Sequence, residues 1–141
     1  MQGLDKICRD IAEFHPNILA TGIAKDAEFL AYCFKERVWI PKPERLTVML
    51  GQAMVLVGLP KINEDFFGKT NVVTIQHEKM HILLFPDHRK SDLIEGSKST
   101  NPAHLAADPC IVVVVAMPPF QHEELVSRVL GYLKSVNICT I

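Results

Sequence analysis

The sequence predicts a mixed α/β (α+β) domain whose elements follow the order α-β-β-α-β-β-β-α. Apolar residues recur at helical spacing in three segments, and runs of β-branched and aromatic residues mark five strands between or beside them. The chain has 141 residues, of which 48% are hydrophobic, and this is enough to bury the core of one domain. We therefore expect a single domain that spans residues 1–141.

The first half of the chain divides into a helix, a hairpin and a second helix. The apolar residues of Leu4–Phe14 follow helical offsets, and Pro16 ends this helix because the residue before a proline disfavours helical geometry. Ile18–Ala24 and Glu28–Phe34 are predicted to be two strands joined by a short polar break. Pro43 then begins the second helix, since its missing N–H costs nothing in a first helical turn.

The second helix carries more apolar residues than one buried face requires. It is stopped or kinked by Gly58 and Pro60, and Ile62–Phe67 is predicted to add a short turn that Gly68 closes. The surplus apolar residues indicate contact with a second copy or with another protein. The interface candidates are Met49, Met54, Val55 and Leu56.

The second half of the chain supplies three strands and a last helix. Val72–Gln76 and Met80–Phe85 are predicted to form a second hairpin. Asp87–Asp108 is polar and long for a connection in a small domain, so we expect a flexible insertion at 87–108. The β-branched run Ile111–Val115 is typical of a strand covered on both faces, and Pro118 precedes the last helix.

Charge and composition exclude several classes of function. Lys plus Arg number 15 and Asp plus Glu number 16, so the net charge is −1, which argues against a nucleic-acid partner. The longest uninterrupted apolar runs are too short to span a bilayer. Residues near the N-terminus do not show a basic segment followed by an apolar run, so we expect no secretion signal. We expect no membrane partner and a cytoplasmic location. Cys8, Cys33, Cys110 and Cys139 are accordingly predicted to be reduced thiols rather than disulfides.

One motif in the sequence carries explicit chemistry. His77–His81 reads HEKMH, which on a helix places two imidazoles on one face for zinc and a glutamate beside the bound water. The alternative function is therefore a zinc-dependent hydrolase or metallopeptidase, with His77 and His81 as metal ligands and Glu78 as general base.

The residues around this motif favour a different interpretation. Its flanks are strand-like, and no convincing third ligand follows. On a hairpin, His77 and His81 would face each other across the strands and bind a metal weakly, or would simply be exposed turn residues. We therefore expect no enzyme activity, no catalytic residue, no resident metal and no cofactor.

The order of elements resembles that of the roadblock (dynein light chain) fold, and short motifs are similar to those of a small archaeal family with that fold. The resemblance covers nearly the whole chain except the insertion. Its motifs fall at the ends or on the faces of predicted elements, and are Phe14–Ile18, Thr21–Ala24, the helical stripe Met49, Gln52 and Met54, Asp65–Gly68, and His77–Lys79.

The resemblance implies a five-stranded antiparallel sheet with the second helix on one face and the other two helices on the opposite face. It also implies a non-enzymatic regulatory or interaction domain, a homodimer that is a platform for a protein such as a small GTPase. The archaeal family itself has no assigned activity. A further alternative is a small-molecule sensor, because related α/β sandwiches enclose ligands; it predicts an apolar pocket between the sheet and a helix.

Overall fold

The structure is a computed structural model, and it describes residues 2–26, 28–35, 41–87, 110–136 and 138. One antiparallel sheet holds five strands in the order β2-β1-β5-β4-β3. The strands are β1 (Ile18–Lys25), β2 (Glu28–Phe34), β3 (Val73–Gln76), β4 (His81–Asp87) and β5 (Cys110–Ala116). The helices are α1 (Gln2–Ala12), α2 (Pro43–Gly58), the 3₁₀ turn Leu59–Asn63, α3 (Glu64–Phe67) and α6 (His122–Ser135). The predicted mixed class and open sheet are confirmed.

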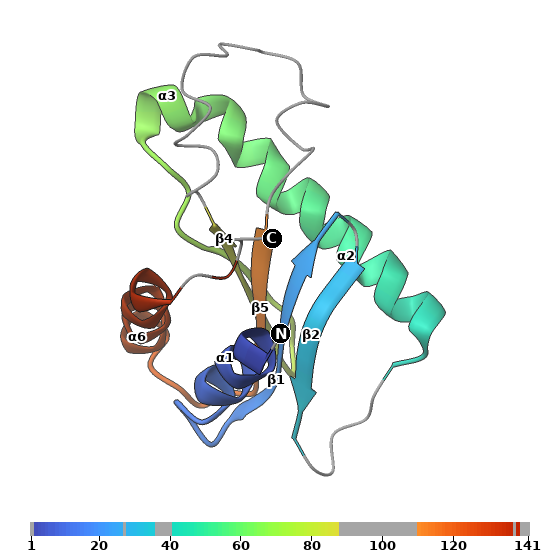
Figure 1. Cartoon of the computed structure of the whole chain (residues 1–141). Coiled ribbons are helices and arrows are strands. Elements are labelled where there is room, and N and C mark those ends of the chain that lie inside the picture. Colours follow the sequence, from blue (N-terminus) through green and yellow to red (C-terminus); the bar gives the residue numbers. More distant parts are fainter. Residues whose placement is uncertain (1, 27, 36–40, 88–109, 137, 139–141) are drawn as a thin grey trace.

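Helices α1 and α6 cover one face of the sheet, and α2 crosses the other (Figure 1). The main core lies under α1 and α6. There Ile11 of α1 and Val129 of α6 are fully buried with Leu83, Phe85 and Val112 of the sheet. Every second residue of β4 and β5 points into this core, as the pleat of a strand requires.

The opposite face is much less completely covered. Here the buried cluster consists of Ala53 and Val57 of α2 with Leu84 of β4 and Ile111 of β5. These strand residues alternate with those of the main core, so both faces of β4 and β5 are apolar. The small cluster fixes the C-terminal half of α2 to the sheet.

Strand directions place two functional segments at one end of the sheet. Four successive antiparallel pairings make β2 and β3 run in the same direction. Phe34 and Gln76, the last residues of these strands, therefore lie at the same end of the sheet. The chain leaves Phe34 for the start of α2, and it leaves Gln76 for the turn 77–80. The N-terminal end of α2 and the β3–β4 turn therefore lie toward the same end of the sheet, and β1, β5 and β4 separate the strands that precede them.

Strand β4 extends beyond the predicted Met80–Phe85, from His81 through Pro86 to Asp87. Pro86 is tolerated because β3 pairs with β4 only as far as Leu84, so only β5 adjoins the proline. Asp87, predicted to begin the insertion, is thus the last residue of a strand. The remainder of that insertion lies outside the described residues.

The short helix α3 confirms the turn predicted over Ile62–Phe67. It ends at Gly68, whose φ of +87° is a conformation that side chains rarely adopt. Pro60 does not stop the helical path, because it occupies the first turn of the 3₁₀ segment, where no N–H is needed.

Candidate functional site

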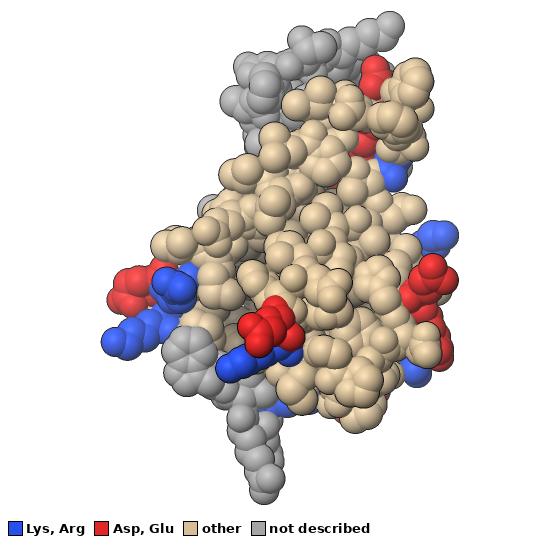
Figure 2. All heavy atoms as spheres, turned by 180° about the vertical axis from the view of Figure 1, so that it is seen from behind, with Lys and Arg blue, Asp and Glu red and all other residues tan. Residues whose placement is uncertain are grey.

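The outer face of α2 and its continuation is an exposed apolar stripe. Its members recur at spacings of seven, four, three and four residues, which place them along one side of a helix. They are 53–82% exposed, and they are Val48, Val55, Leu59, Ile62 and Phe66. We call these five residues the outer stripe. Seen from behind, this face of the molecule is largely uncharged, with acidic and basic side chains in a few small groups (Figure 2).

The four predicted interface candidates have different positions around α2. Val55 belongs to the outer stripe, Met49 and Leu56 are exposed beside it, and all three line a groove beside the helix. Met54 is partly buried and packs against the cluster that contains Val57 and Leu84. Leu59 and Ile62 are not among the predicted candidates, because Gly58 and Pro60 predict the end of the apolar helix.

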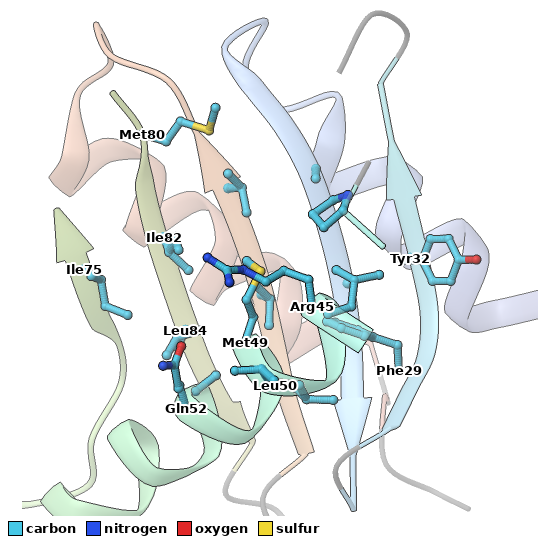
Figure 3. A pocket seen from close by; sticks show the side chains of 18 of the residues that line it. Phe29, Tyr32, Arg45, Met49, Leu50, Gln52, Ile75, Met80, Ile82 and Leu84 are labelled. Atoms are coloured by element: carbon cyan, nitrogen blue, oxygen red, sulfur yellow. The ribbon is translucent and has the colours of Figure 1, made fainter. Parts of the chain in front are cut away.

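A groove of about 1420 Å³ separates much of α2 from the sheet. Its walls come from α2, from β2 and from the β3–β4 hairpin, and its floor comes from β1, β4 and β5. In Figure 3, Arg45 and Met49 extend from α2 over the sheet, and Phe29 of β2 points toward them from the other side. The groove lies where the small-molecule alternative places an apolar pocket.

Small residues in β1 give the groove its depth. Ala20 and Gly22 line it where larger side chains would fill it. At Gly22 an added Cβ would come within 2.8 Å of Cε1 of Phe29, so the ring packs directly over bare backbone. The rest of the floor is aliphatic and includes Ile82, Val113 and Val115.

The charged residues that line the groove all have the same sign. They are Lys42, Arg45 and Lys79, with His77 beside them, and no Asp or Glu is among the described lining residues. Lys42 and Arg45 lie at the start of α2, and His77 and Lys79 lie in the β3–β4 turn, so all four share one end of the groove. None of the three cationic side chains forms an ion pair or hydrogen bond with a described residue.

The HEKMH segment does not form the predicted alternative metal site. It is the turn of a hairpin rather than a helix, and His81 pairs with Gln76 instead of facing His77. His77 lines the groove on the α2 face, whereas the ring of His81 contacts Phe120 on the opposite face, at 5.1 Å between centroids. The two imidazoles thus lie on opposite sides of the sheet, and Glu78 is exposed between them. No group of three or more metal-binding side chains occurs among the described residues.

The cysteines correct a second expectation. Cys8 and Cys33 are free thiols, but Cys110 is disulfide-bonded. The prediction of a reduced Cys110 is wrong because Cys110 is only 3% exposed, and such a buried position suits a free thiol and a half-cystine equally well. Cys139 lies outside the described residues. Burial also raises the pKa of the Cys8 thiol from 9.0 to about 11, so it is a packing group and not a nucleophile.

The expectation that no segment is long enough to span a bilayer needs a similar correction. By length and composition alone, Pro43–Phe67 would suffice. Only 17% of the residues in its most apolar stretch are buried in the structure. The expectation rests on uninterrupted apolar runs, and polar residues such as Arg45, Gln52 and Lys61 interrupt this segment. The same property describes a helix that is apolar on nearly all sides and lacks a complete covering.

The sequence matches no protein-family model and no curated protein. Solved structures match along nearly all of the chain. A roadblock/LC7 domain from Streptomyces avermitilis superposes with a TM-score of 0.60 at 11% identity, over 94% of this chain and 95% of that one. The chain has the roadblock/LC7 fold.

Two further structures share this fold with the chain. The gliding protein MglB from Thermus thermophilus gives a TM-score of 0.59 at 13% identity, over 95% of this chain and 87% of that chain. A structure of MglB with tetrameric arrangement gives a TM-score of 0.56 at 12% identity, over 92% of this chain and 84% of that chain. At these identities the likeness is one of fold; it agrees with the fold implied by the sequence resemblance and gives no support to the archaeal family.

Proposed function

We propose that this protein is a non-enzymatic interaction domain that forms a homodimer through the outer stripe of α2. The observation that carries the proposal is the exposure of Val55, Leu59 and Ile62, at 59%, 58% and 53%, on one side of a helix. A contiguous apolar surface of this kind is typical of an interaction site on a soluble protein. A two-fold axis would bring the same stripe of two copies together, because such an interface is self-complementary.

The regular spacing of the stripe favours another helix as its partner. Apolar residues alternating at three and four positions form the seam of paired helices, in which each side chain fits between those of the facing helix. The fold itself accommodates self-assembly, since one neighbour is described as an MglB with tetrameric arrangement. The outer surfaces of α1 and α6, which cover the opposite face of the sheet, would then remain free for another protein.

Within this proposal the dimer is a regulatory platform, and a small GTPase is the partner we expect. The roadblock resemblance of the sequence supports this choice. The absence of a convergent catalytic constellation among the described residues is consistent with a binding role. Binding assays against the small GTPases of the source organism, each loaded with GDP and with a GTP analogue, test this part separately from self-association.

Sedimentation equilibrium between 1 and 100 µM tests the dimer. We expect wild-type protein to be dimeric at the upper end and Leu59→Asp/Ile62→Asp to be monomeric throughout, because each change places a charge where apolar area would be buried. The variant loses two such side chains from each copy, four in the dimer, which removes roughly 6–12 kcal/mol of burial and raises Kd at least 100-fold. Leu30→Asp is the matched control, because Leu30 is an exposed leucine of edge strand β2. A wild-type monomer at 100 µM would refute the proposal.

A further inference from the structure

We propose that the groove between α2 and the sheet binds a single-chain anionic amphiphile, with the acyl chain on the aliphatic floor and the anionic group at the end that carries Lys42, Arg45 and Lys79. The proposal goes beyond the interaction domain described above and does not depend on dimerisation. Two members of the outer stripe, Val48 and Val55, also line the groove, whereas Leu59, Ile62 and Phe66 do not, so Leu59 and Ile62 are the positions at which the two surfaces can be tested separately.

The shape and lining of the groove favour an elongated apolar molecule. Its volume of about 1420 Å³ exceeds the roughly 300–1,000 Å³ of usual small-ligand pockets, and its described floor is aliphatic from Leu84 to Val115. Removing a hydrocarbon chain from water onto such a floor is favourable in proportion to the area covered. Phe29 and Met49 flank this path from opposite sides (Figure 3).

The charges of the groove decide the sign of the head group. Three cationic side chains and one imidazole line it, and none of its described lining residues is acidic. The nearest acidic residues in sequence, Glu44 and Glu78, are exposed and do not line the groove. An anion at this end would gain charge-assisted hydrogen bonds, to which the guanidinium of Arg45 is especially suited.

The position of the cations makes the ligand amphiphilic rather than merely anionic. The start of α2 and the β3–β4 turn bring all of them to one end of the groove, and the aliphatic residues continue from there toward Leu50 and Leu84. One charged end and one long apolar path correspond to one anionic group on one acyl chain. A neutral lipid would leave the cationic end unused, and a free anion would leave the floor uncovered.

Displacement of the fluorescent fatty acid cis-parinarate by palmitate tests the proposal, with hexadecan-1-ol as the neutral competitor of equal chain length. We expect wild-type protein to bind one palmitate per chain. In the Lys42→Gln/Arg45→Gln variant, the affinity for palmitate should fall at least 10-fold and the affinity for hexadecan-1-ol less than 2-fold. Both residues are exposed, so these changes should preserve the fold. The matched control is Arg9→Gln/Lys134→Gln, which removes the same charges from the α1 and α6 face and should change neither affinity.

Two further variants distinguish binding in the groove from binding at the outer stripe. Val115→Phe fills the floor and should weaken both competitors, with circular dichroism confirming the fold. Leu59→Asp/Ile62→Asp should abolish the dimer and retain palmitate, so failure of one proposal is distinguishable from failure of the other. The proposal is overturned if palmitate does not bind at 100 µM, or if the protein binds only to phosphatidylglycerol vesicles. It is also overturned if Lys42→Gln/Arg45→Gln lowers the affinity for both competitors equally, or if the monomeric variant no longer binds palmitate.

Discussion

Two glycines show how the local surroundings of a residue decide the effect of one methyl group. A Cβ at Gly22 would meet the ring of Phe29 at 2.8 Å, whereas a Cβ at Gly131 of α6 meets nothing within 4 Å. We expect Gly22→Ala to lower the free energy of unfolding by about 1–3 kcal/mol through overpacking. Gly131→Ala should raise it by about 0.5–1 kcal/mol, because alanine loses less backbone freedom in a helix. Urea unfolding of both variants measures the difference, and equal shifts would contradict this account of the groove floor.

The buried Cys8 thiol gives stability a dependence on alkaline pH. Burial raises its pKa from 9.0 to about 11, so the folded protein holds this proton more tightly than the unfolded chain does. The associated stability is fully present below pH 9 and is lost as pH rises toward 11. Between pH 8 and pH 10, wild-type protein should lose about 1 kcal/mol more than Cys8→Ala does. Parallel losses in the two proteins would show that Cys8 titrates as it does in the unfolded chain.

The phenol of Tyr132 also makes stability fall as pH rises, but at a higher pH than the Cys8 thiol does. Burial, followed by the hydrogen bond that its hydroxyl donates to Asp10, raises its pKa to about 12. The same hydrogen bond is the main reason that the pKa of Asp10 is lowered. Stability from the phenol is thus present below pH 10 and lost toward pH 12, whereas stability from the carboxylate is lost only on acidification.

At the scale of elements, α2 is held by far fewer buried residues than the strands it crosses. In the small cluster Ala53 and Val57 anchor it to Leu84 and Ile111, and the residues of its outer stripe are 53–82% exposed. Elements with few buried apolar contacts open at lower free energy than the global transition. Amide hydrogen exchange should therefore be faster in α2 than in β1, β4 and β5 at low protein concentration. Equal protection across these elements would contradict the sparse anchoring.

The sequence was most informative where one element decides its own structure. The β-branched run of β5, the two hairpins and the first turn at Pro43 are local properties, and they were predicted nearly to the residue. The face on which each strand residue lies depends on register, and register is set by pairing with distant strands. For this reason the opposite placement of His77 and His81 could not be read from their spacing.

The groove could not be predicted from the sequence, because it too depends on how distant strands pair. Its cations come from segments about 35 residues apart, around Arg45 and Lys79, and only the shared direction of β2 and β3 brings them together. The apolar excess of α2 was visible in the sequence, but its division into an outer stripe and a groove wall requires knowledge of where the sheet lies.

At the scale of the whole molecule, self-association and stability are coupled. If two copies bury the outer stripe, mass action stabilises the folded dimer, so the midpoint of thermal unfolding rises with protein concentration. We expect this rise between 2 and 200 µM for wild-type protein and none for Leu59→Asp/Ile62→Asp. Scanning calorimetry at these concentrations provides the measurement, and a midpoint independent of concentration in both proteins would speak against the dimer.

The bare backbone of β1 has a consequence for how the groove behaves when it is empty. Pockets walled by long side chains close when those side chains change rotamer, and a ligand must reopen them. Here Ala20 and Gly22 of the floor have no rotamers to change, and the ring of Phe29 against Gly22 is the side chain beside them that can move. The groove floor is preorganised in this sense, and binding there requires little rearrangement of the sheet. Selectivity for chain length would then reside in two positions of one strand, where a single larger side chain would shorten the space available.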